Sequence, residues 1–169
     1  YMDFWDQSLL PEAADYDNLI LLRTCSKALG LAAPRVGFAV ANPRLTGILQ
    51  AAKSPYNVNA VSQAMAAVVL ENPAYREVYR ELLIASRDML MEGLRRLQDK
   101  GLLTVQESCT NFAYIRVGNA RQIFEALADR GILVRLFGED HLRITAGTQA
   151  ENQEVIACLD FLIQNREKL

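Results

Sequence analysis

One long amphipathic pattern near the middle of the chain constrains its fold most strongly. Between residues 74 and 100, apolar side chains recur at steps of three or four, and a glycine follows as a stop signal. The spacing predicts a single helix of about 40 Å, at roughly 1.5 Å per residue. A helix of that length commonly connects two layers or two domains, so we expect the fold to change across it. The apolar positions are Val78, Leu82, Leu83, Leu90, Leu94 and Leu97.

Before this helix, two short apolar segments are typical of strands that are buried on both faces. The first covers residues 18–24, and the second covers residues 35–41 and ends at an Asn-Pro pair. Two shorter helices are expected over residues 43–52 and 58–70. The stretch of small residues that joins the two strands is the part of the chain with the most functional interest.

After the long helix, the pattern changes to short alternating elements. Strands are predicted over residues 112–117, 132–137 and 141–146, and amphipathic helices over residues 120–130 and 150–166. This alternation indicates a small α+β unit at the end of the chain.

The charge balance argues against several classes of partner. With 18 Lys and Arg against 20 Asp and Glu, the net charge is −2, so we expect neither nucleic acid nor an anionic membrane as a partner. No apolar run approaches the roughly 18 residues of a membrane span, and the start lacks signal-peptide features, which indicates a cytoplasmic protein.

Three widely spaced cysteines indicate reduced thiols and no metal site. Because the chain opens on Tyr1 and not on Met, we expect a piece of a longer protein.

Residues 24–37 carry the strongest chemical signal. Taken alone, Lys27 is more often a surface ammonium than a nucleophile. Its neighbours change this expectation, because the hydroxyls of Thr24 and Ser26 and the cation of Arg35 would form an anion cradle beside the amine. Such a cradle fits a phosphate-bearing aldehyde cofactor.

This segment resembles the lysine motif of fold-type I pyridoxal-phosphate aminotransferases, Ser/Thr-x-Ser-Lys-x-x-x-Leu-Ala-x-x-Arg-x-Gly. The resemblance implies that Lys27 forms the internal aldimine with pyridoxal 5'-phosphate and moves the α-proton of the substrate. It also implies that Thr24, Ser26 and Arg35 bind the cofactor phosphate. Residues 1–4 resemble the end of another family motif, in which Tyr1 would donate a hydrogen bond to the phenolic oxygen of the cofactor. The alternative for Tyr1 is a frayed terminal residue.

Within that superfamily, the chain is most similar to the histidinol-phosphate aminotransferase family. The similarity is carried by residues 54–64, 110–112, 131–138 and 142–148, in the family's order and spacing, with Ala146 where the family usually has Val. It implies a homodimeric enzyme of histidine biosynthesis that moves an amino group between L-histidinol phosphate and 2-oxoglutarate. The chain would be its C-terminal portion and, on its own, inactive.

The resemblance also implies a fold class and a division into domains. The fold class is α/β, as the C-terminal part of the fold-type I transferase fold, with the end of the large, mainly parallel sheet and a small α+β domain. Residues 1–72 would complete the large cofactor domain, residues 73–100 would form the connecting helix, and residues 101–169 would form the small domain.

Three further residues are candidates for substrate binding. Arg135 and Arg143 lie on neighbouring predicted strands, and a guanidinium can grip a carboxylate or phosphate with two parallel hydrogen bonds. The resemblance implies that they bind the substrate anions, including glutamate. Without it, an arginine paired with Glu139 or Asp140 is the more ordinary interpretation. Asn111 is a weaker candidate, because an Asn that precedes a strand is commonly a turn residue.

Other readings of the same residues stay open. Threonine-phosphate decarboxylases and aromatic aminotransferases share Lys27 and Arg35, so residues 56–63 and Arg135 have to discriminate between these enzymes. A different hypothesis is a catalytically inert piece that serves as an assembly partner.

Cys25 is more simply a small buried thiol than a second nucleophile. His141 has no neighbour in the sequence that favours a catalytic triad.

Overall fold

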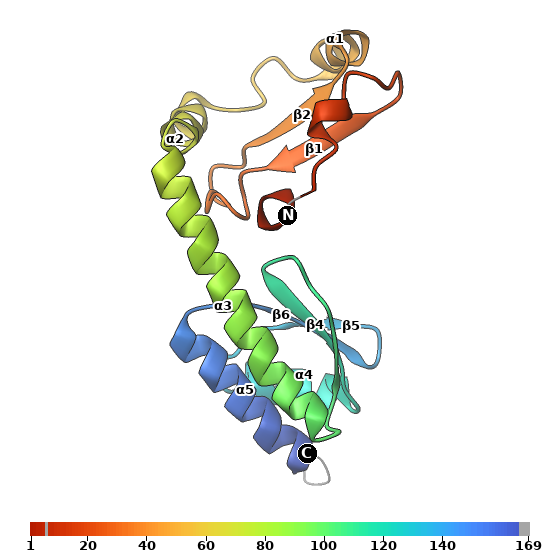
Figure 1. Ribbon diagram of the computed structural model, residues 1–169, viewed down its shortest axis with the longest axis vertical. Coiled ribbons are helices and arrows are strands. Elements are labelled where there is room, and N and C mark those ends of the chain that lie inside the picture. The colour runs from red at the N-terminus through yellow and green to blue at the C-terminus, as the bar shows by residue number, and fades with distance from the viewer. Residues whose placement is uncertain (6, 166–169) are drawn as a thin grey trace. The chain divides into compact units, whose positions relative to one another are not determined.

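A computed structural model describes residues 1–5 and 7–165 of the chain. The chain divides into two compact units, unit 1 (Tyr1–Glu81) and unit 2 (Leu82–Leu169). The long helix predicted over residues 74–100 is confirmed as α3 (Pro73–Asp99), and it contributes residues to both units (Figure 1). The finer division at residues 72 and 100 stays a prediction.

Unit 1 is built on an antiparallel pair of strands, β1 (Ile20–Thr24) and β2 (Gly37–Ala41), in which Thr24 lies opposite Gly37. Two helices follow, and each begins at an Asn whose side chain accepts a hydrogen bond from a backbone N–H three residues on. These helices are α1 (Pro43–Ala52), capped by Asn42, and α2 (Ala60–Leu70), capped by Asn59.

The expectation that both strands are buried on both faces is wrong. Leu22 is 79% exposed, and Ile20 and Phe38 are also exposed. Within the described part of the chain this sheet has two strands, and the buried cluster of unit 1 lies elsewhere. That cluster consists of Cys25, Leu31, Val36 and Ala66, so it joins the loop between the strands to α2. The apolar side chains of the strands themselves therefore reach solvent.

Unit 2 contains a four-stranded antiparallel sheet among the described residues, in the order β3-β4-β6-β5. Its elements are β3 (Thr104–Gln106), β4 (Phe112–Arg116), α4 (Ala120–Ala128), β5 (Arg135–Phe137), β6 (His141–Thr145) and α5 (Gln149–Gln164). The three predicted strands and two predicted helices are confirmed, with β5 shorter than expected. The sequence did not predict β3, whose three residues are too few to show a period.

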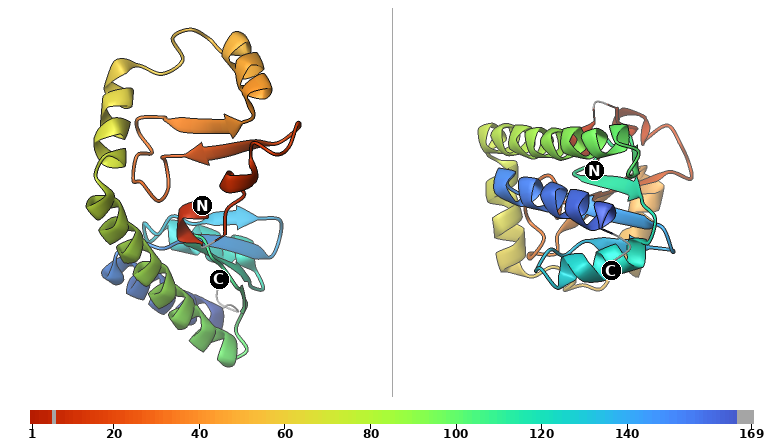
Figure 2. Two further views of the ribbon diagram at one scale, coloured as in Figure 1. Left: turned by 45° about the horizontal axis from the view of Figure 1, so that its top comes forward. Right: turned by 90° about the horizontal axis from the view of Figure 1, so that it is seen from below.

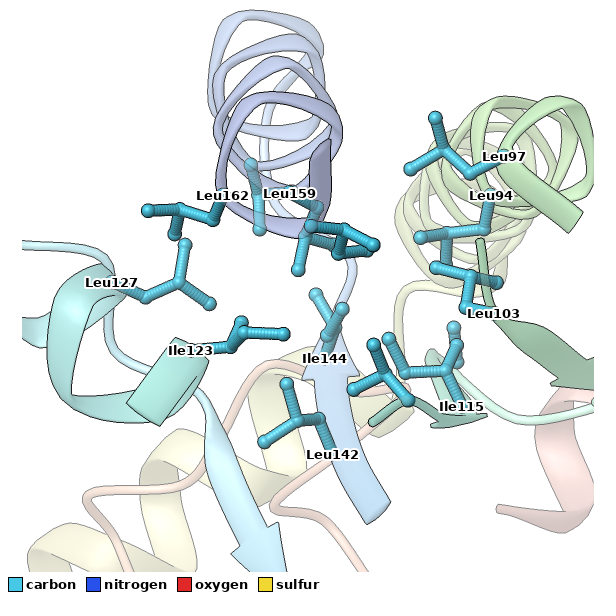
Figure 3. Packing of buried hydrophobic residues seen from close by; sticks show 14 of the residues in the cluster. Leu94, Leu97, Leu103, Ile115, Ile123, Leu127, Leu142, Ile144, Leu159 and Leu162 are labelled. Atoms are coloured by element: carbon cyan, nitrogen blue, oxygen red, sulfur yellow. The ribbon is translucent and has the colours of Figure 1, made fainter. Parts of the chain in front are cut away.

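Helices cover one face of this sheet. The second half of α3 and α5 lie side by side (Figures 1 and 2), and a Cβ on Gly93 would meet Ile156 Cδ1 at 2.2 Å, which shows how closely the two helices approach. Buried leucines and isoleucines from the strands, α3, α4 and α5 converge on this face (Figure 3). Those labelled in the figure include Leu94, Ile115, Ile123, Leu127, Leu142, Ile144, Leu159 and Leu162.

Side chains alternate between the two faces along each strand, so a different set of residues lies on the face opposite the helices. We call this second face the arginine face. The register places Tyr114 of β4, Arg143 of β6 and Arg135 of β5 in one row across the three strands. The neighbouring row contains Arg116, His141 and Phe137, and Phe112 lies on the same face of β4.

Candidate functional site

In unit 1, the loop between β1 and β2 is held in a compact shape by its own backbone. The N–H of Cys25 donates to the carbonyl of Val36 at 3.0 Å, and the N–H of Leu31 donates to the carbonyl of Cys25 at 2.9 Å. Gly30 has a φ of +69°, and a Cβ there would lie 3.2 Å from the Tyr79 ring. The loop therefore presents Ser26 and Lys27 from a defined turn.

The predicted phosphate ligands gather at the end of β1. The backbone N–H of Ser26 donates to Oγ1 of Thr24 at 3.1 Å, and Nη1 of Arg35 lies 3.5 Å from Oγ of Ser26. Arg35 also donates to the carbonyl of Ala32 at 2.8 Å, and its backbone adopts a left-handed φ of +58°. Non-glycine residues in this region cost free energy and concentrate at functional sites. Two hydroxyls and one guanidinium are thus brought together.

Gly37 lies where β2 begins, directly opposite Thr24. A Cβ added to it would meet the backbone carbonyl oxygen of Arg23 at 2.8 Å, closer than side-chain carbons approach backbone oxygens. The motif glycine therefore allows the ends of the two strands to close beside the hydroxyl groups.

Lys27 and Tyr1 lie close together in unit 1. Nζ of Lys27 is 5.7 Å from the centroid of the Tyr1 ring, within the range of a cation–π contact, and the lysine is half-buried. The tyrosine ring also lies 6.5 Å from that of Phe4. The structure therefore brings Tyr1 to the lysine, while the roles of the two residues stay predictions.

An ion pair that the sequence did not indicate lies beside them. Asp3 pairs with Arg23, twenty positions along the chain, and no local pattern in the sequence connects the two. The nearby Cys25 is fully buried, and burial, followed by the negative charge of Asp3, raises the pKa of its thiol. A thiol with a raised pKa is a poor nucleophile, which agrees with a packing role for Cys25.

The groups around the β1–β2 loop fit the phosphorylated aldehyde that the resemblance implies. Hydroxyl and guanidinium N–H groups are the donors that phosphate oxygens accept from, and an amine is the group with which an aldehyde condenses. Thr24, Ser26, Arg35 and Lys27 supply this donor set within one loop.

In unit 2, Arg135 and Arg143 lie directly opposite each other on the arginine face. Neither forms an ion pair within the described part of the chain, and Asp140 instead contacts Nε of Arg116 and Nδ1 of His141, each at 2.7 Å. The hydrogen bond from Arg116, followed by the charge of His141, lowers the pKa of Asp140. Asp140 therefore pairs with Arg116 and His141, and with neither Arg135 nor Arg143.

His141 and Asn111 have other contacts. The imidazole of His141 stacks on Tyr114 at a centroid distance of 5.0 Å, and its Nδ1 contacts Asp140. Asn111 precedes β4, and its backbone carbonyl accepts a hydrogen bond from the N–H of Ala146 at 2.9 Å. The proposed role of its side chain in substrate binding stays a prediction.

A buried polar network fixes the loop that follows β6. Asn152, 1% exposed, donates to the carbonyl and hydroxyl oxygens of Ser86, each at 3.0 Å, and accepts from the N–H of Gly147 at 2.9 Å. Thr148 and Glu151 then form a capping box at the start of α5. These contacts hold the end of the strand that carries Arg143.

Within the described ranges, no three His, Cys, Asp or Glu side chains gather as a metal site would require. In the same part of the chain, no helix has the length and apolar character needed to cross a membrane.

Comparison with known proteins gives a consistent result. The profile of the family "Aminotransferase class I and II" matches residues 1–159. The histidinol-phosphate aminotransferase of Clostridium novyi is 38% identical over 163 residues, which is 94% of this chain and 45% of that protein. Histidinol-phosphate aminotransferase 1 of a Nostoc species is 36% identical, over 99% of this chain and 48% of its own.

The fold also matches solved structures. A histidinol-phosphate aminotransferase from Sinorhizobium meliloti, in complex with pyridoxal-5'-phosphate, aligns with a TM-score of 0.82 and 27% identity. The alignment covers 92% of this chain and 44% of that structure. The chain thus spans about half the length of the relatives that it matches.

Proposed function

The chain belongs to the class I and II aminotransferases and has the fold of the fold-type I pyridoxal-phosphate enzymes, and from this premise we propose that it serves L-histidinol-phosphate transamination. In this reaction an amino group moves between L-histidinol phosphate and 2-oxoglutarate, as a step of histidine biosynthesis in the cytoplasm. The activity is proposed for the protein in which these residues are the C-terminal portion, and we expect the 169 residues alone to be inactive. The observation that carries the proposal is the gathering of Thr24, Ser26 and Arg35 at the end of β1 and in the loop after it, directly beside Lys27 in the sequence.

Pyridoxal phosphate, when bound, supplies an aldehyde that condenses with amines and a ring that withdraws electrons from the substrate. The amine of Lys27 would hold the cofactor through its aldehyde, and the same amine would take the proton from Cα of the amino donor as a general base. Arg35 and the hydroxyls of Thr24 and Ser26 hold the phosphate with charge-assisted hydrogen bonds. Tyr1, whose ring lies beside Nζ of Lys27, would donate a hydrogen bond to the phenolic oxygen of the cofactor.

On the arginine face, we assign Arg143 and Arg135 to the anionic groups of the substrates. Two guanidinium groups directly opposite each other repel, unless an anion neutralises them. Carboxylates and phosphates are the anions that this face would attract, and both occur in the proposed substrates. Asn111, at the start of β4, is a further candidate for substrate contact.

We further propose that the protein is a homodimer. Val61, Met65 and Val68 follow one another along α2 at steps of four and three, and they are 70%, 45% and 68% exposed. An apolar stripe of this kind on a helix face supports a buried interface with a second copy.

The experiment is a transamination assay with the complete protein that carries this chain. It is supplied with pyridoxal phosphate, L-histidinol phosphate and 2-oxoglutarate, and the formation of glutamate is followed. We expect turnover with histidinol phosphate well above that with aromatic amino acids, and no carbon dioxide release from threonine phosphate. Lys27→Ala should abolish turnover, while Lys53→Ala, an exposed lysine at the end of α1, should leave it unchanged. Absence of turnover with histidinol phosphate would contradict the assignment.

A further inference from the structure

Two aromatic rings flank the guanidinium of Arg143 on the arginine face. Its Cζ lies 5.0 Å from the ring centroid of Phe112 and 5.8 Å from that of Phe137. Both distances fall within the range in which an aromatic face attracts a guanidinium. The sequence motifs assigned no role to either phenylalanine.

The strand register shows that the two rings approach from different sides. Phe112 lies opposite Thr145, two residues after Arg143 on β6, whereas Phe137 lies opposite His141, two residues before it. One ring belongs to β4 and the other to β5, the two strands that flank β6. The two rings therefore flank Arg143 from diagonally opposite positions on the neighbouring strands.

The guanidinium is also incompletely satisfied by the protein. Nε of Arg143 is buried and has no hydrogen-bond partner within the described part of the chain. Buried hydrogen-bond donors are nearly always paired in folded proteins. An unpaired donor at a candidate site therefore indicates that a bound ligand supplies the acceptor. Asp140, the carboxylate directly before β6, is already engaged by Arg116 and His141.

The ring of Phe137 is itself supported by its neighbours. It meets Tyr114 edge to face, at 5.9 Å between centroids and 67° between planes, and Tyr114 stacks in turn on His141. Tyr114 lies opposite Arg143 in the register. Phe137 is thus part of a connected aromatic layer with Tyr114 and His141, and this layer limits the rotation of the arginine side chain.

We propose that Phe112 and Phe137 are positioning residues, which fix the plane of the Arg143 guanidinium so that its N–H groups take a planar substrate carboxylate. This inference rests on the proposed function, because it assumes that Arg143 binds the carboxylate. The physical benefit is preorganisation: an arginine side chain that is already ordered loses little freedom when the anion arrives.

The test uses the complete protein that carries this chain, labelled with ¹⁵N, and glutarate, a dicarboxylate that lacks the amino and keto groups needed for reaction. The Nε–H signal of Arg143 is assigned with Arg143→Lys and followed during titration. The variants are Phe137→Leu, Phe137→Trp and Phe112→Leu. Phe161→Leu is the matched control, since Phe161 is an exposed phenylalanine on α5, 57% exposed against 40% for Phe137. Thermal unfolding is recorded for every variant.

We expect the Arg143 signal to lie upfield of the other arginine signals because of the two rings, and to move when glutarate binds. Phe137→Leu and Phe112→Leu should each weaken glutarate binding by roughly three- to tenfold, Phe137→Trp should restore it, and Phe161→Leu should leave it unchanged. Wild-type affinity in both leucine variants would overturn the inference and leave the proposed function standing. A wild-type Arg143 signal that does not respond to glutarate would overturn the carboxylate role of Arg143 and this inference with it, whereas the proposed function is decided separately by turnover with histidinol phosphate.

Discussion

Arg135 and Arg143 lie directly opposite each other on adjacent antiparallel strands, and neither is paired with a carboxylate in the described part of the chain. Like charges in this position destabilise a sheet by about 0.2–1 kcal/mol. Arg116, on the same face, differs because Asp140 contacts it at 2.7 Å. The contrast separates an arginine that has a carboxylate partner from the two arginines that we propose bind substrate anions.

Arg135→Gln should therefore raise the free energy of unfolding by about 0.2–1 kcal/mol while weakening the binding of glutarate. Urea unfolding followed by circular dichroism measures the first effect, and titration calorimetry measures the second. Arg116→Gln is the matched control, which removes an ion pair and should leave stability unchanged or slightly lower. Equal losses of stability in the two variants would contradict the account.

Gly37→Ala should destabilise unit 1, because its Cβ would meet the backbone oxygen of Arg23 at 2.8 Å. The expected loss is about 1–3 kcal/mol, typical of overpacking. Gly47→Ala provides the control within α1, where no atom lies within 4 Å of the added Cβ, and it should stabilise the helix by up to about 1 kcal/mol. The fluorescence of Trp5, the single tryptophan of the chain, reports on unit 1 during denaturation. Changes of the same sign in both variants would refute this explanation of the motif glycine.

Asn152→Ala should lower the stability of unit 2 by about 1–3 kcal/mol, because it removes the partner of the Gly147 N–H and the two hydrogen bonds that Asn152 donates to Ser86. The neighbouring Gln153→Ala, at an exposed position of the same helix, should change the stability by less than about 0.5 kcal/mol. Urea unfolding compares the two. If Asn152→Ala loses no more stability than Gln153→Ala, the network does not stabilise unit 2.

The capping box of α5 should make stability depend on pH. The N–H of Thr148, 2.6 Å from Oε2 of Glu151, and then its hydroxyl lower the pKa of that carboxyl from the ordinary value of 4.5. A carboxyl with a lowered pKa in the folded state stabilises fully above pH 4.5, and the contribution is lost as the pH falls below that value towards the folded pKa.

The measurement is the difference in unfolding free energy between the wild type and Glu151→Gln, from pH 7 down to pH 3. We expect a constant difference above about pH 5 that shrinks at lower pH. Glu154→Gln, on the same helix but outside the capping box, should show a smaller dependence. A wild-type advantage over Glu151→Gln that persists unchanged at pH 3 would be inconsistent with this account.

The sequence predicted the helices and most strands because their apolar periods are local properties of the chain. It also singled out Thr24, Ser26, Lys27 and Arg35 as one group of candidates, because these residues lie close together in the sequence, and their roles stay predictions. The burial of β1 and β2 was predicted wrongly, since burial depends on which other elements cover a strand, and Leu22 carries no local sign of its exposure. The contacts of Arg143 with Phe112 and Phe137 escaped prediction because they depend on the register of three strands.

The central claim, that Lys27 is the anchor for pyridoxal phosphate, is tested most directly by reductive trapping. The complete protein that carries this chain is incubated with pyridoxal phosphate, reduced with borohydride, digested, and mapped by mass spectrometry. We predict a pyridoxyl group on Lys27, with occupancy reduced in Arg35→Gln, and far less label on the exposed Lys53 and Lys100. Label spread evenly over these lysines, or absent from Lys27, would contradict the claim.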